Sequence, residues 1–130
     1  MARLIIEAVS GESKFSDIMF HLELFVSVSD AKTGIPVSGL RPEHFRLSSP
    51  VGKLFDMNIS SQTEAAWDGV QNDGAGCYSL GVSISKDGGK QKLEWIEGEF
   101  YPFGVQVRFT DDQNELYMGQ TVVRVQSLGK

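Results

Sequence analysis

The amino-acid sequence predicts an all-β fold, an antiparallel β-sandwich of about seven to eight strands. Apolar residues recur at every second position in several runs, which is the spacing of a strand with one buried face. Clusters of Asp, Asn, Gly, Ser and Pro separate these runs, as turns do. No segment keeps the 3.6-residue period of an amphipathic helix. Together these patterns favour a sandwich of short strands.

The clearest strand covers residues 20–28. Its alternating apolar residues are Phe20, Leu22, Leu24, Val26 and Val28. Asp30 and Gly34 then mark a turn, because Asp caps turn backbones and Gly tolerates a positive φ. Pro36 and Pro42 keep the stretch that follows out of a helix.

Shorter strands are predicted in the middle of the chain. Phe45 and Leu47 indicate one, and the alternating residues Phe55, Met57 and Ile59 indicate another. Residues 60–76 are dominated by turn-forming residues and predict a long loop, with a short paired segment near residues 64–67. Loops this long are often functional in compact domains.

Three more strands follow from the remaining alternation. Residues 78–84 and 103–109 alternate strictly, and residues 116–125 form the last run. That last run changes phase near Gly119, which predicts a β-bulge there. Residues 3–9 are expected to add an edge strand.

Composition excludes several classes of partner. The 130 residues fit a single domain, residues 1–130, and carry a net charge of −5. Nucleic acid and anionic membranes both require a basic surface, so neither is expected as a partner. We find no membrane-spanning segment and no secretory signal, and we expect a cytoplasmic protein, with export by a signal-independent route left open. The single cysteine, Cys77, excludes an intramolecular disulfide and fits a reducing compartment.

Three short motifs resemble a known group of domains. Residues 26–40 run from a strand into Asp30, a Thr-Gly turn, and then Pro-Val and Gly; residues 76–80 and 98–105 each contain a Gly followed by an aromatic strand entry. In this order the motifs resemble bacterial immunoglobulin-like and carboxypeptidase-regulatory-like domains. The resemblance implies an immunoglobulin-like β-sandwich. It implies no single activity, since that group includes adhesins, filament subunits, enzyme accessory domains and assembly scaffolds.

The residue types of common active sites are present but are not arranged as one. Cys77 has no flanking motif of a nucleophile, and nothing in the sequence places it beside His21 or His44. The paired carboxylates fall in turn-like sequence, and none has the spacing of a calcium loop. We therefore predict no catalytic residues, no metal site and no cofactor.

Aromatic and apolar residues outside the core phase point to binding. We predict a non-enzymatic protein-binding or assembly module, with a protein partner or a second copy bound through Phe25, Trp67, Tyr117 and Val122. The alternative is a carbohydrate-binding module, in which Trp67, Trp95 and Tyr101 would stack on sugar rings.

Overall fold

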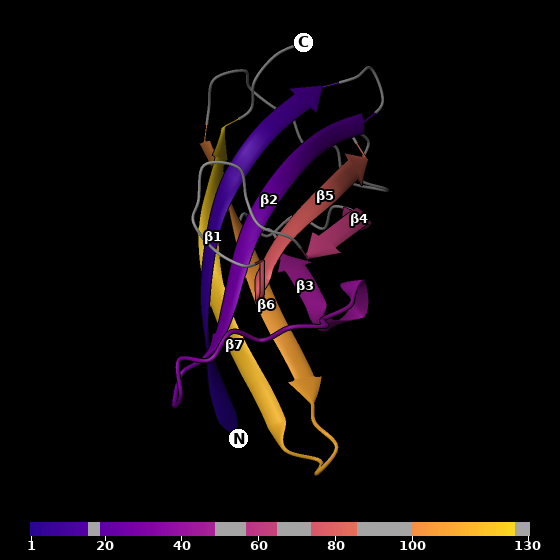
Figure 1. The fold of residues 1–130 in the computed structure, drawn as a ribbon. Coiled ribbons are helices and arrows are strands. Elements are labelled where there is room, and N and C mark those ends of the chain that lie inside the picture. Colours follow the sequence, from indigo (N-terminus) through magenta and orange to yellow (C-terminus); the bar gives the residue numbers. More distant parts are fainter. Residues whose placement is uncertain (16–18, 49–56, 65–73, 86–99, 127–130) are drawn as a thin grey trace.

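The fold is a single curled sheet of seven strands. The computed structural model describes residues 1–15, 19–48, 57–64, 74–85 and 100–126. In the order β3-β6-β7-β1-β2-β5-β4 the strands form one sheet (Figure 1). They are β1 (Ala2–Phe15), β2 (Met19–Asp30), β3 (Phe45–Ser48), β4 (Met57–Glu64), β5 (Cys77–Ser85), β6 (Phe100–Thr110) and β7 (Leu116–Gln126). A short 3-10 helix, η1 (Pro42–His44), precedes β3, and the described residues contain no α-helix, so the all-β prediction is confirmed.

Strand β1 departs from the prediction in two ways. It lies in the middle of the sheet, with β2 on one side and β7 on the other, so the prediction of an edge strand is wrong. It runs parallel to β7, with Ala2 opposite Tyr117 and Arg3 opposite Met118. The sheet is therefore mixed, and the prediction of a wholly antiparallel architecture is wrong at this pair. Each of the two strands is antiparallel to its other neighbour, β1 to β2 and β7 to β6.

The predicted alternation accounts for the core. The inward positions of β2, β5 and β6 are buried; they are Leu22, Leu24, Val26, Val28, Tyr78, Leu80, Val82, Phe103, Val105 and Val107. Burying one such side chain fully stabilises the fold by roughly 1.5–3 kcal/mol. Because strand side chains alternate between faces, the same pattern fixes which residues point outward.

Gly119 has a different role from the predicted bulge. The pairing of β6 with β7 runs without a shift from Phe100 opposite Gln126 to Thr110 opposite Leu116. A Cβ at Gly119 would lie 2.6 Å from the carbonyl oxygen of Leu4 and 2.8 Å from Cγ1 of Ile6. The glycine therefore permits the close approach of β1. Without a bulge, the odd-numbered residues of β7 all face the core and the even-numbered ones face outward.

The predicted turn after β2 is confirmed. The carboxylate Oδ1 of Asp30 accepts from the backbone N–H of Lys32 at 2.8 Å and of Thr33 at 3.3 Å. The N–H of Gly34 donates to the carbonyl of Asp30 at 2.8 Å, and Gly34 has a φ of 73°. This turn reverses the chain so that Pro36 forms a bridge with Ser29.

The sheet bends until its ends face each other (Figure 1). The rings of Phe45 on β3 and Tyr78 on β5 lie 5.3 Å apart in an edge-to-face arrangement. The side-chain amide of Gln62 on β4 donates to the carbonyl oxygen of Leu40, which leads into η1. The core fills the space inside this bend.

The buried phenol of Tyr78 holds the chain segment that leads into β3. Its hydroxyl donates to the carbonyl of Val37 at 2.6 Å and accepts from the N–H of Leu40 at 3.2 Å. Burial raises the pKa of Tyr78 to about 12, and the nearby carboxylate of Glu64 acts in the same direction.

Glu64, at the end of β4, joins three segments. Its two carboxylate oxygens accept from the N–H of Gly39 at 3.0 Å and of Gly76 at 2.8 Å. Desolvation by burial acts to raise the pKa of Glu64, but these backbone donors and the side chain of Ser38 lower it below its ordinary value. The carboxylate is thus a structural anion.

The predicted loop at residues 60–76 is shorter than expected. Strand β4 continues to Glu64 and pairs with β5, so the first residues of that stretch are strand. Phe55 and residues 65–73 lie outside the described residues.

Candidate binding surface

The outward-facing residues of β3, β6 and β7 form one continuous surface. The register places Arg46 beside Gln106 and Gln120, and Ser48 beside Gly104 and Val122. We call this surface the β6 face. It consists of Arg46, Ser48, Gly104, Gln106, Arg108, Met118, Gln120 and Val122. Two hollows lie on it.

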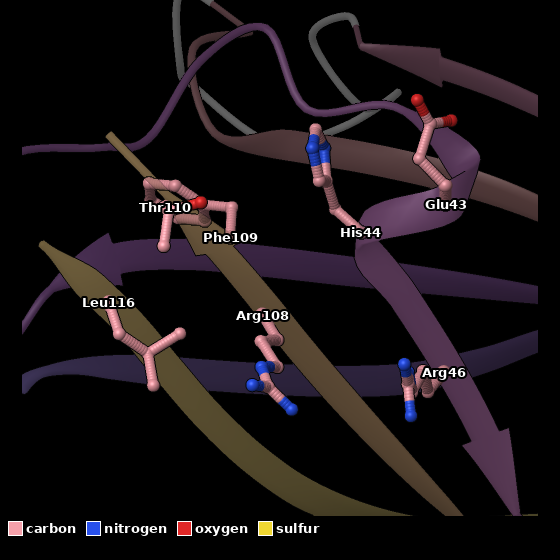
Figure 2. Close-up of a pocket in the computed structure, with 7 residues that line it drawn as sticks. All are labelled: Glu43, His44, Arg46, Arg108, Phe109, Thr110 and Leu116. Atoms are coloured by element: carbon pink, nitrogen blue, oxygen red, sulfur yellow. The ribbon is translucent and has the colours of Figure 1, made fainter. Parts of the chain in front are cut away.

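The first hollow, of about 330 Å³, lies where η1 meets β3, β6 and β7. Figure 2 shows the residues that line it, which are Glu43, His44, Arg46, Arg108, Phe109, Thr110 and Leu116. The side chains of Arg46 and Arg108 are exposed, and the register puts both on the outward-facing side of the sheet, because Arg46 is opposite Gln106 and Gln106 shares a face with Arg108. The hollow therefore presents two cations to solvent.

No described acidic side chain forms an ion pair with Arg46 or Arg108. Glu43, the acidic residue in the lining, lies 4.0 Å from Arg41, and its carboxylate extends away from both guanidinium groups (Figure 2). The chain as a whole carries a net charge of −5, so two arginines without an ion pair among the described residues make this a locally basic site on an acidic protein.

His44 fixes the wall of this hollow. Its Nδ1 accepts from the backbone N–H of Arg41 at 2.8 Å, and its ring packs edge-on against Phe109 at 6.1 Å. With Nδ1 accepting, the proton of the neutral ring sits on Nε2. This geometry gives His44 a role in positioning η1.

The second hollow, of about 370 Å³, lies further along β6. Its lining includes Ser48, Gly104, Gln120 and Val122. Gly104 supplies no side chain, and a Cβ there would lie 2.5 Å from Oγ of Ser48. Val122, one of the four predicted binding residues, borders the hollow and is 61% exposed. The second hollow therefore has an exposed apolar side chain at its border.

Phe25 lies on the outer face of β2, as its phase predicts. It is opposite Val9 of β1, which is 56% exposed, and its ring covers Gly11, whose Cβ would lie 2.7 Å from Cε2 of Phe25. Phe25 and Val122 both point outward from the sheet but lie over different strands, Phe25 over β1 and β2 and Val122 over β6 and β7.

Tyr117 faces the core side of β7. Its ring stacks on Phe109, with centroids 4.9 Å apart and an interplanar angle of 4°. It is half-buried and packs against the core, so its position is explained by packing within the chain. The absence of the predicted bulge is why the residue lies inward.

The remaining aromatic candidates are not brought together. Trp67 and Trp95 lie outside the described residues. Tyr101 is half-buried and packs against the core. The carbohydrate-binding alternative therefore stays a prediction from the sequence.

Sequence reasoning did not single out Arg46 and Arg108. The alternation identifies both as outward positions on their strands, but neither residue is unusual there by itself. Their proximity follows from the pairing of β3 with β6, which places Arg46 opposite Gln106 and hence next to Arg108.

The described residues hold no group of three or more His, Cys, Asp or Glu side chains that could bind a metal ion. Cys77 is buried at the start of β5. Within the described ranges, no helix has the length and apolar character needed to cross a membrane.

The comparisons with known proteins give no match. No family model, no curated protein and no solved structure matches the chain.

Proposed function

We propose that this chain is a non-enzymatic protein-binding or assembly module with an immunoglobulin-like sandwich architecture. The strand order supports the architecture: β1-β2-β5-β4 and β3-β6-β7 correspond to the A-B-E-D and C-F-G sheets of a constant-type immunoglobulin domain. In this assignment β1 is the strand shared by both halves. The lone, buried thiol of Cys77 supports the cytoplasm as its location.

The main support for this proposed function is the composition of the β6 face. It combines exposed Val122, the pair Arg46 and Arg108, and two adjacent hollows. Arginine and methionine are enriched at protein interfaces, and hollows receive the anchoring side chains of a partner. A partner protein seated here would cover both hollows.

Site-specific photo-crosslinking in the source cells tests this proposal. Benzoylphenylalanine in place of Gln120 reports on the β6 face, and the same residue in place of the exposed Glu23 reports on the outer side of β2, which β1 separates from β7. We expect a discrete protein adduct from position 120 that is lost in the Val122→Asp variant. Adducts from position 23 alone, or none from either position, would contradict the proposal.

A further inference from the structure

We infer that the β6 face binds an extended acidic segment of the partner protein, with one carboxylate between Arg46 and Arg108 and one apolar side chain beside Gly104 and Val122. This inference rests on the proposed function and specifies the chemistry of the partner.

The arginine pair provides the anion site. Arg46 is opposite Gln106, so Arg108, two residues further along β6, is its diagonal neighbour on the same face. Such neighbours lie about 7–8 Å apart, a separation that arginine side chains span easily. Like charges at this distance repel each other, and a carboxylate between them would replace repulsion with charge-assisted hydrogen bonds. The exposed hydroxyl of Thr110 lines the same hollow and offers a further donor.

The charge of the whole chain favours a local carboxylate over a polyanion. Nucleic acid presents a long array of phosphates, which a chain of net charge −5 repels outside this one site. A single acidic side chain of a peptide, in contrast, can be bound by one local pair of cations. The neighbouring Glu43 does not occupy the site, since it lies beside Arg41.

The distance between the two hollows indicates an extended peptide and sets the spacing of its two anchoring side chains. Arg108 and Gly104 are four residues apart on β6, which corresponds to about 14 Å along a strand. A peptide in extended conformation covers the same length in four residues, and its residues i and i+4 point to the same side. A segment lying along β6 would therefore present an Asp or Glu to the arginines and an apolar residue, four positions away, to Val122.

Peptide selection tests the inference. A displayed library of random twelve-residue peptides is selected on the purified chain and counter-selected on the Arg46→Gln/Arg108→Gln double variant. We expect enrichment of Asp or Glu four positions from Leu, Ile, Val or Phe. Synthetic peptides from the selection should bind the double variant at least tenfold more weakly than the wild-type chain, and the Val122→Asp variant should also bind weakly.

Two controls make the result specific. Lys32→Gln removes one positive charge in the turn after β2, away from the β6 face, and should bind the peptides as the wild-type chain does. Unfolding curves must show that each variant is folded. Selected peptides without carboxylates, equal binding to the double variant, or arginine-dependent binding of a 20-base-pair DNA duplex in place of the peptides would overturn the inference.

The two proposals can fail separately. If the adduct from position 120 forms but survives Arg46→Gln/Arg108→Gln, the β6 face binds a protein by other means and the acidic-segment inference is wrong. If no adduct forms from position 120, the proposed function itself is wrong.

Discussion

Phe45 and Tyr78 pack edge-to-face at 5.3 Å although β3 and β5 are five steps apart in the order of the sheet. In a flat sheet those strands would lie about 24 Å apart, since neighbours are spaced by about 4.8 Å. The short distance between the two rings therefore shows that the sheet is strongly curled. The hydroxyl of Tyr78 and the carboxylate of Glu64 hold the segment between β2 and β3 across this curl.

Replacing Tyr78 with Phe should destabilise the fold at neutral pH by about 1–3 kcal/mol, because the Leu40 N–H and the Val37 carbonyl lose a buried partner. The folded-state pKa of Tyr78 is raised to about 12, so the contribution of its phenol is complete below pH 10 and is lost as the pH rises towards 12. Urea denaturation should therefore give a difference in the free energy of unfolding between wild type and Tyr78→Phe that becomes smaller between pH 10 and 12. A difference that does not change with pH would contradict this prediction.

Replacing Glu64 with Gln should lower the stability of the fold at neutral pH but not at acidic pH. The amide can accept from only one of the N–H groups of Gly39 and Gly76, so the variant should lose about 1–2 kcal/mol at pH 7. The folded-state pKa of Glu64 lies below the ordinary 4.5, so the wild-type advantage is present above pH 4.5 and is lost as the pH falls further. Thermal unfolding between pH 7 and 3 measures this. Glu7→Gln, an exposed change of the same charge on β1, should change stability by less than about 0.5 kcal/mol.

Gly119→Ala tests the close approach of β1 and β7. The added Cβ would meet the Leu4 carbonyl at 2.6 Å, and backbone cannot rotate away as a side chain can, so we expect a loss of about 2–3 kcal/mol in chemical denaturation. Gly104→Ala is the matched control, because the one atom that its added Cβ would approach too closely is the hydroxyl oxygen of Ser48, which can turn away, and its other contacts, at 3.8 and 3.9 Å, are ordinary. Equal losses in both variants would mean that the β1–β7 contact is looser than described.

Variants of Tyr117, a residue predicted to bind a partner, distinguish a role in stabilising the fold from a role in binding. Loss of the stack on Phe109 should cost about 2 kcal/mol of stability, as measured by urea denaturation. Tyr117→Phe keeps the stacked ring and should retain most of that stability. If Tyr117→Phe instead abolished the adduct from position 120 with no change in stability, a binding role would be indicated.

Much of the fold could be predicted from alternation alone. The buried positions of β2, β5 and β6 match the predicted inward residues, since burial on one face imposes a period of two. The edge position predicted for residues 3–9 is wrong because the central position of β1 depends on its pairing with β7, which is far away in the sequence.

The candidate site was predicted less completely, for a physical reason. Val122 and Phe25 could be found because each is apolar at an outward position of its own strand. Arg46 and Arg108 are ordinary surface residues until strand pairing makes them neighbours, and a single sequence does not reveal that pairing. The change of phase near Gly119 predicts a bulge, because a glycine that permits the close approach of another strand cannot be distinguished in the sequence from a glycine in a bulge.

The position of β1 also constrains the order in which the protein can form. Its hairpin with β2 can pair early in synthesis, but its other edge meets Tyr117 and Met118, which are made after the six preceding strands. Among the described strands, β1 alone is hydrogen-bonded to both the β2-β5-β4 half and the β7-β6-β3 half. Its pairing with β7 is a contact of long sequence separation, and such contacts slow folding. Until β7 arrives, a nascent chain exposes one unpaired edge of β1, which makes that edge the natural place for a chaperone to act or for two unfinished chains to pair wrongly.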